Sequence, residues 1–135
     1  MHTLTAFHLN IDGLCRKVDE IKHLATVEKI DIICLTETKL TKNIANSRID
    51  LPGYDFIRLD RECSRGGGLV AYIKSTINFK EINLVEENIN GCECFAFSVK
   101  LCNNEEAYFV LMYRPPSGNK TIFSTHLIIF LPTML

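Results

Sequence analysis

The chain has 135 residues, of which 47% are hydrophobic and 23% charged, and its formal net charge is −1. This length suits one domain with a modest core and is too short for two domains. The composition argues against a disordered chain, and the balanced charge excludes a globally basic surface for nucleic acid. No apolar run is long enough to cross a membrane.

Six cysteines raise the question of disulfides. The N-terminal sequence MHTLTAFHLN lacks the basic start and apolar core of a secretory signal. Cys15 and Cys34 lie within apolar patterns, and no pair of CxxC motifs indicates a zinc site. We therefore expect reduced thiols in an intracellular protein of the nucleus or cytoplasm, with no signal peptide.

The first part of the chain predicts a β-α-β unit. Apolar residues alternate over residues 4–11, which is typical of a strand with one apolar face, and Asp12-Gly13 ends it. The next apolar positions have helical spacing and predict a helix that ends near Lys29 (Leu14, Val18, Ile21 and Ala25). Residues 30–36 are almost continuously apolar, which predicts a strand buried on both faces and parallel to the first.

Polar side chains follow the two parallel strands at the point where each ends. These are Asn10 and Asp12 after the first strand and Glu37 after the second. Ligands of open α/β sheets bind at this edge, and carboxylate oxygens suit a hard cation such as Mg²⁺. An alternative is that Glu37 caps a helix or pairs with Lys39 or Lys42. Spacing alone leaves both interpretations open.

The middle of the chain is rich in strands. Residues 54–60 and 69–74 predict a hairpin with a long loop, and residues 43–48 predict a loop or helical turn. Further strands are expected at the ranges 79–85, 93–101 and 107–113, the last two joined at the Asn103-Asn104 turn. The apolar segment 121–135 is open to three interpretations, which are a strand, a failed core segment and a floppy end.

The first hairpin also carries a local group of cations, namely Arg58, Arg61, Arg65 and Lys74. Such a group could contact DNA phosphate, with a solvated hairpin as the alternative. The glycines at 66–68 have no P-loop context, and we expect them to let a strand begin with unusual backbone angles.

Four motifs in order carry a family resemblance. They are HLNIDGL at 8–14, LTETKL at 35–40, RLDRECSRGGGLVAYIK at 58–74 and LMYRPPSG at 111–118. Together they resemble the endonuclease/exonuclease/phosphatase superfamily, which has the deoxyribonuclease I-like fold. The nearest resemblance is to the apurinic-type endonuclease domain of non-LTR retrotransposons. It covers residues 4 to about 120.

The resemblance implies an α/β fold, a partial four-layer α/β sandwich of deoxyribonuclease I type. We expect the first β-sheet layer with its helix, and the second half of the domain largely missing. Residues 1–120 would form the N-terminal part of an endonuclease/exonuclease/phosphatase domain, and residues 121–135 a divergent apolar tail.

The resemblance also implies a site that acts on DNA. Asn10 and Tyr113 would contact the phosphate as catalytic residues, and Glu37 would bind Mg²⁺ or Mn²⁺, with Asp12 as an accessory metal position. The cations expected at the nucleic acid are Arg61, Arg65 and Arg114.

The family's GDFN and SDH catalytic motifs are absent from these residues. The residue directly before His126 is not an aspartate, so His126 is not assigned a catalytic role. We therefore expect a fragment of a magnesium-dependent DNA endonuclease that is inactive as it stands. The alternative is a non-enzymatic remnant or an interaction module that completes its sheet with another chain, with residual metal or nucleic-acid binding.

Overall fold

The computed structural model of the chain describes residues 3–62, 66–84, 88–89, 92–114 and 124–131. The chain divides into two compact units, Met1–Thr76 and Ile77–Leu135, and each is described by itself. Both units are built on a β-sheet, and the helices of the described residues are few and short.

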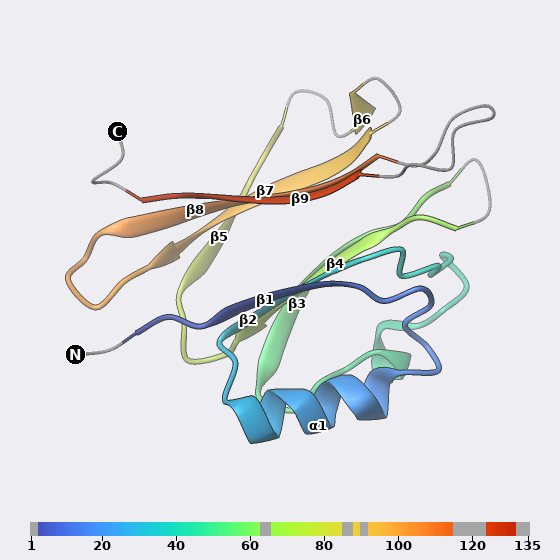
Figure 1. Ribbon diagram of the computed structural model, residues 1–135, viewed down its shortest axis with the longest axis horizontal. Helices are drawn as coiled ribbons and strands as arrows, with labels where there is room; N and C mark the ends of the chain where they lie inside the picture. Colours follow the sequence, from blue (N-terminus) through green and yellow to red (C-terminus); the bar gives the residue numbers. More distant parts are fainter. Residues whose placement is uncertain (1–2, 63–65, 85–87, 90–91, 115–123, 132–135) are drawn as a thin grey trace. The chain divides into compact units, whose positions relative to one another are not determined.

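The first unit is a four-stranded sheet with one α-helix (Figure 1). Its elements are β1 (Ala6–Asn10), α1 (Val18–Glu28), β2 (Ile32–Thr36), the 3-10 turn η1 (Asn46–Arg48), β3 (Tyr54–Leu59) and β4 (Leu69–Lys74). The strand order is β1-β2-β4-β3. β1 and β2 are parallel, and β3 and β4 form an antiparallel hairpin, so both pairings expected from the sequence are confirmed.

The helix α1 packs against one face of this sheet. Ile21 and Ala25 of the helix lie in one buried cluster with Ile33 and Leu35 of β2. The helix begins at Val18, later than the pattern from Leu14 predicted, because residues 14–17 form a turn in which the Lys17 amide donates to the Leu14 carbonyl at 2.8 Å. No helix among the described residues has the length and apolarity needed to span a bilayer.

Two tyrosine hydroxyl groups, of the buried Tyr72 and the half-buried Tyr54, tie the loops of the first unit to this core. The Tyr72 hydroxyl donates to the Ile49 carbonyl at 2.6 Å, and the Tyr54 hydroxyl donates to the Ile30 carbonyl. Both bonds satisfy a polar tip whose ring is used for packing. The Tyr72 bond fixes the segment between β2 and β3 to the sheet, and the Tyr54 bond joins the start of β3 to the turn before β2.

The second unit is a five-stranded sheet made of β5 (Phe79–Ile82), β6 (Asn88–Ile89), β7 (Cys92–Lys100), β8 (Glu106–Arg114) and β9 (Ser124–Phe130). The order is β5-β7-β8-β9, with β6 also paired to β7, and the expected hairpin of β7 and β8 is confirmed. Its aromatic core includes Phe97 and Phe109, whose stacked rings have centroids 5.0 Å apart.

The second unit adds a sheet to the expected one, and it decides how the segment 121–135 is to be interpreted. The first β-sheet layer with its helix was expected, and the described residues form a second sheet as well. In the 121–135 segment the strand interpretation is the one the structure shows, because β9 pairs antiparallel with β8. Residues 121–123 and 132–135 lie outside the described residues.

Candidate metal and phosphate site

The ends of β1 and β2 are joined by backbone hydrogen bonds that continue beyond the strands. Asn10 stands opposite Thr36 in the parallel register. Past that pair, the Gly13 amide donates to the Glu37 carbonyl at 2.8 Å, and the Leu14 amide donates to the Thr38 carbonyl at 2.9 Å. The three residues expected from the sequence, Asn10, Asp12 and Glu37, therefore lie at one edge of one compact unit.

This edge concentrates unusual backbone conformations. Asp12, Glu37 and Lys39 have φ angles of 49°, 53° and 55°, in the left-handed region that side chains disfavour. Each such residue costs on the order of 1–2 kcal/mol, so it persists only where neighbouring structure enforces it. Strain of this kind gathers at functional sites, and here it gathers at the predicted one.

The glycine stretch supplies the third segment of the site. Gly66, Gly67 and Gly68 all have positive φ, as the sequence led us to expect. The Lys39 amide donates to the Gly67 carbonyl at 2.8 Å, and the Thr38 amide donates to the Gly68 carbonyl at 3.3 Å. Residues 10–13, 36–39 and 66–68 are thus bound together, and we call them the strand-end loops.

An ion pair crosses the strand-end loops. The Lys39 Nζ lies 2.5 Å from Oδ1 of Asp12. This hydrogen-bonded contact lowers the pKa of Asp12 from its ordinary 3.8, and it raises the pKa of Lys39. Glu37 also raises the pKa of Lys39, but by less than Asp12 does. The main partner of Lys39 is therefore Asp12, and not Glu37 as the alternative interpretation of the sequence had it.

Several polar atoms at this edge are buried. The Nδ2 of Asn10 and the Oγ1 atoms of Thr36 and Thr38 have no hydrogen-bond partner among the described residues. A buried polar group without a partner costs about 1–3 kcal/mol, so such atoms are rare in interiors and common where a polar ligand is held. The sequence analysis did not single out Thr36 or Thr38, although the polar run TETK directly after an apolar strand marks them.

The donor set at this edge fits a hard cation. Asn10, Asp12 and Glu37 offer only oxygen ligands, and Mg²⁺ binds through one or two carboxylates while it keeps several waters. Among the described residues there is no cluster of three or more His, Cys, Asp or Glu side chains, which a fully protein-bound metal would require. The carboxylate of Asp12 is paired with Lys39, whose charge a cation bound there would have to share.

Tyr113 and Arg114 lie in the second unit, at the end of β8. Tyr113 is 1% exposed and stands opposite Glu93 of β7, a residue that is also buried, at 6% exposure. Arg114 is exposed. Sequence reasoning missed Glu93, because a glutamate at the start of an expected strand carries no sign that its side chain will be buried.

The cations of the first hairpin occupy different places. Arg61 lies just beyond the end of β3, whereas Lys74 pairs with Tyr54 at the other end of the hairpin. Lys74 approaches Asp31 there, at 4.0 Å. Arg58 is held by Asp60, and Arg65 lies outside the described residues. Among the described cations of this hairpin, Arg61 is therefore the one that lies beside the strand-end loops.

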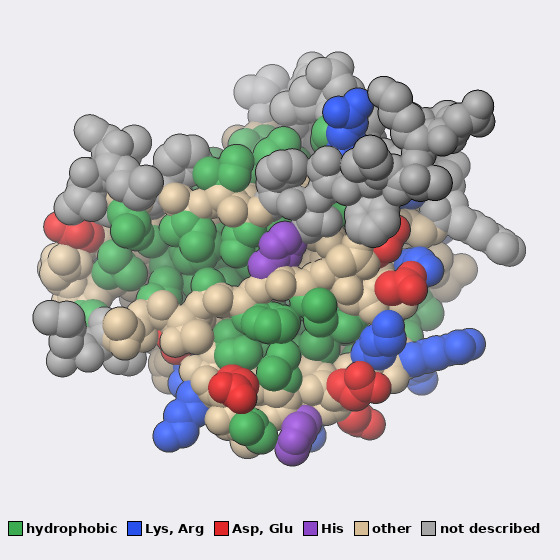
Figure 2. All heavy atoms as spheres, viewed as in Figure 1, with side chains coloured by type: hydrophobic (Ala, Val, Ile, Leu, Met, Phe, Trp, Pro, Cys, Tyr) green, Lys and Arg blue, Asp and Glu red, His purple; other side chains and the backbone are tan. Residues whose placement is uncertain are grey.

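Lys and Arg side chains are interspersed with Asp and Glu on the described part of the face shown in Figure 2. This mixing agrees with the net charge of −1. Nucleic-acid contacts on such a surface must come from a local arrangement of cations and not from an extended basic field.

Comparison with known proteins identifies the fold. No family model matches the chain, and no curated protein matches it. Among solved structures, the catalytic domain of Xenopus laevis APE2 matches with a TM-score of 0.50 and 20% sequence identity, over 79% of this chain. The chain spans 42% of that structure. The chain is therefore a mixed α/β protein with two sheets and few helices among its described residues, and its fold resembles part of that catalytic domain.

Proposed function

We propose that this chain is the N-terminal part of a magnesium-dependent DNA endonuclease domain of the kind carried by non-LTR retrotransposons. The observation that supports it most directly is the edge at which β1 and β2 place Asn10, Asp12 and Glu37, two of them in strained backbone. The nuclease-like fold supports the same class of activity, and the four sequence motifs support the retrotransposon type.

Each residue of this edge has a role in the proposal. Glu37 anchors Mg²⁺ through its carboxylate, and Asp12 is an accessory position held by Lys39. Asn10 orients the scissile phosphate. Tyr113 belongs to the second unit and not to this edge, and its proposed hydrogen bond to a phosphate oxygen rests on the sequence resemblance alone. When bound, the metal would neutralise charge that builds up on the phosphate during hydrolysis. DNA is the proposed substrate, with Mn²⁺ as an alternative metal.

The proposal assigns binding, and not turnover, to these 135 residues. The family's GDFN and SDH motifs, which complete the catalytic set, are absent from the sequence. An in-line attack on phosphorus needs an oriented water and a stabilised leaving oxygen as well as a metal. We therefore expect no nicking of supercoiled plasmid by this chain alone.

The test is thermal unfolding of the full chain with and without Mg²⁺. A ligand at ten times its Kd stabilises the folded state by about 1.4 kcal/mol, which raises Tm. We expect Mg²⁺ to raise the Tm of the wild type, and Glu37→Gln to remove most of that rise while the metal-free fold persists. Glu28→Gln, at an exposed helix position, is the matched control and keeps the response. An equal response in Glu37→Gln would refute the metal assignment.

A second candidate function is favoured by the charges at the sheet edges. Each sheet has two edge strands. β3, at one edge of the first sheet, and β5, at one edge of the second sheet, carry charged residues. The opposite edge strands, β1 of the first sheet and β9 of the second, contain no Lys, Arg, Asp or Glu. Charges protect edge strands from pairing, so β1 and β9 suit a module that adds a strand from another chain. Concentration-dependent assembly of the folded chain, measured by sedimentation velocity, would support this candidate over the first.

A further inference from the structure

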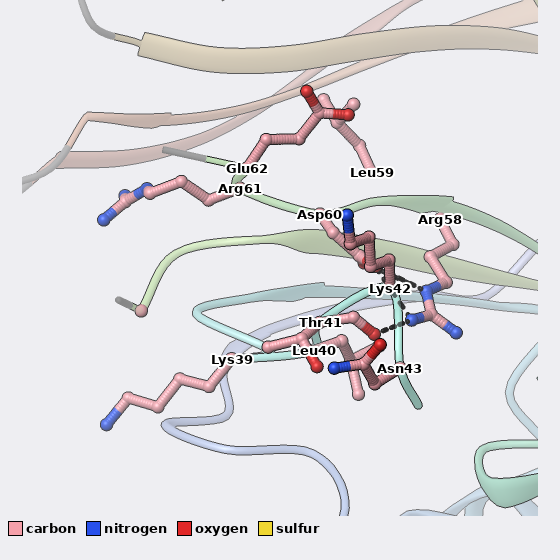
Figure 3. Close-up of a pocket in the computed structure, with 11 residues that line it drawn as sticks. Lys39, Leu40, Thr41, Lys42, Asn43, Arg58, Leu59, Asp60, Arg61 and Glu62 are labelled. Atoms are coloured by element: carbon pink, nitrogen blue, oxygen red, sulfur yellow. Dashed lines mark hydrogen bonds and ion pairs between the residues drawn. The ribbon is translucent and has the colours of Figure 1, made fainter. Parts of the chain in front are cut away.

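Charges that line one groove of the first unit are used within the protein. This groove lies between residues 39–43 and residues 58–62 (Figure 3). The guanidinium of Arg58 binds both carboxylate oxygens of Asp60, and it donates to two carbonyls of the 41–46 loop, at 2.7 and 2.8 Å. This Arg58 network fixes the loop to β3 and does not identify a partner. The outer edge of β9, in the second unit, does indicate one.

β9 is an edge strand without the features that protect such strands from pairing. It is hydrogen-bonded to β8 on one side, and no described strand lies on its other side. Its pairing runs without a bulge over Ser124–Phe130, a range that contains no proline. The opposite edge strand, β5, is protected by its short length and by Lys80 and Glu81. The outer edge of β9 therefore presents backbone donors and acceptors in position for another strand.

The side chains of β9 are apolar on both faces of the sheet. Ile128 and Ile129 are each 38% exposed, and Leu131, directly after the strand, is 39% exposed. These are three of the five exposed large apolar side chains among the described residues. Ile128 stands beside Val110 and Ile129 beside Phe109, and consecutive strand residues point to opposite faces. A helix packed on one face would cover only one of the two isoleucines, whereas a strand added alongside β9 covers both.

We propose that β9 pairs antiparallel with β9 of a second copy of this chain, so that the two second-unit sheets join into one continuous sheet. The inference rests on the second candidate function, and it names the strand and the partner. A two-fold axis perpendicular to the sheet sets each β9 antiparallel to its copy, and such an isologous contact closes at two chains. With the axis at Ile128, this residue faces its own copy and Leu127 faces Ile129. The contact then consists of apolar cross-strand pairs and backbone hydrogen bonds.

Symmetry favours β9 itself over the other edge strands as the partner. A two-fold axis sets each residue near its own copy, so a charge close to the axis would face a like charge. The sequence STHLIIF of β9 contains no Lys, Arg, Asp or Glu and meets this condition. Pairing of β9 with β5 or β1 of another copy would be heterologous, and would build rings or filaments in place of a closed dimer. In addition, β5 is charged, and β1 alternates its apolar residues with His8 and Asn10.

The test is sedimentation equilibrium of the full chain, which gives both the number of copies and the dissociation constant. We expect a monomer–dimer equilibrium. Ile128→Lys sets two like charges at the axis and should raise the dissociation constant by more than about tenfold, because symmetry counts the substitution twice. The matched control is Val27→Lys, at a 58% exposed apolar position on α1, which should change the constant by less than about twofold. Circular dichroism shows that each variant keeps its fold.

Hydrogen exchange of the wild type, resolved by NMR, tests the contact without a substitution. The amides on the outer edge of β9 should become protected as the concentration of the chain rises, because the second copy accepts their hydrogen bonds. The amides of β1 should exchange at the same rate at every concentration.

Three results would overturn the inference. One is assembly that Ile128→Lys leaves unchanged and Leu9→Lys, on β1, abolishes, in which case the interaction module stands and β9 is not its surface. Another is growth beyond two copies, which would indicate heterologous pairing. The third is a chain that stays monomeric at every concentration, which would refute the second candidate function as well. Protected β9 amides in that monomer would show that a segment of the same chain covers the edge. The Mg²⁺ response is measured separately, so none of these results decides the metal assignment.

Discussion

The Nζ of Lys39 and Oδ1 of Asp12, which lie 2.5 Å apart, join the loop after β2 to the loop after β1. Both residues have left-handed backbone, so the pair links two strained positions. The side chains are 47% and 65% exposed, and an ion pair so accessible to solvent and salt adds little to stability. Its effect is to hold the accessory carboxylate of the candidate metal site in its ionised form.

We predict that Lys39→Gln raises the pKa of Asp12 toward its ordinary value of 3.8, as measured by NMR titration of the aspartate carboxyl carbons. In the wild type the pKa of Asp12 is lowered, so its stabilising contribution exists above 3.8 and is lost as pH falls through the folded pKa. The pKa of Lys39 is raised, so its contribution exists below 10.5 and is lost as pH rises through the folded pKa. Lys42→Gln should leave the pKa of Asp12 unchanged, and an unchanged value in Lys39→Gln would contradict the pairing.

This pair also shows what the sequence could and could not predict. The alternation of residues 4–11 and the apolar run at 30–36 predicted parallel strands, and from them the edge that gathers Asn10, Asp12 and Glu37. The partner of Lys39 was not predictable in the same way. Residues close in sequence suggested Glu37, whereas the register of β1 on β2 decides for Asp12.

Arg58→Met should destabilise the first unit by about 2 kcal/mol, because it leaves the Asp60 carboxylate without its partner and frees the 41–46 loop. The pair is 13% and 18% exposed, so solvent compensates only in part. Urea unfolding monitored by circular dichroism measures the change. Arg58→Lys keeps the charge but loses the planar fork, and should recover less than half of the loss.

The matched control for this prediction is Lys74→Met. Lys74 approaches Asp31 only at 4.0 Å and is 43% exposed, so its loss should change the free energy of unfolding by less than about 0.5 kcal/mol. If both variants lose the same stability, the Arg58 network is not what fixes the loop.

The second sheet shows where sequence patterns lose information. β8 alternates buried and less buried residues and was predicted nearly to its ends, while β6 has only two residues and gave no periodicity. In β9 the residues Leu127-Ile128-Ile129-Phe130 are continuously apolar, a pattern shared by strands and disordered apolar tails. What determines β9 is its pairing with β8, which no local pattern encodes.

Gly68→Ala should cost more stability than Gly53→Ala, although both glycines have positive φ. At Gly53, with φ +85°, a Cβ meets nothing within 4 Å, so the substitution costs only the backbone strain of about 1–2 kcal/mol. At Gly68 the same strain is joined by a collision with Oγ1 of the buried Thr38. We expect a difference of at least about 1 kcal/mol in urea unfolding.

Gly67→Ala separates stability from ligand binding. Its Cβ collides with the far end of the flexible Arg61 side chain, which can move, so the stability loss should match that of Gly53→Ala. The displaced guanidinium should nevertheless weaken binding of duplex DNA, which Gly53→Ala leaves unchanged. Equal duplex affinity in the two variants would show that the position of Arg61 on the glycine stretch does not matter.

Thiol labelling should report the unfolding of the first unit through Cys34. This residue lies in β2 with 0% exposure, and burial raises its pKa to about 12, so the reactive thiolate is absent at neutral pH. Because the folded pKa is above the ordinary 9.0, this group destabilises the folded state as pH rises above 9.0. In native buffer we expect iodoacetamide to modify the exposed Cys102 quickly and Cys34 only at the rate of unfolding, as resolved by peptide mass spectrometry. Labelling of Cys34 as fast as Cys102 would mean that β2 is not the closed central strand described here.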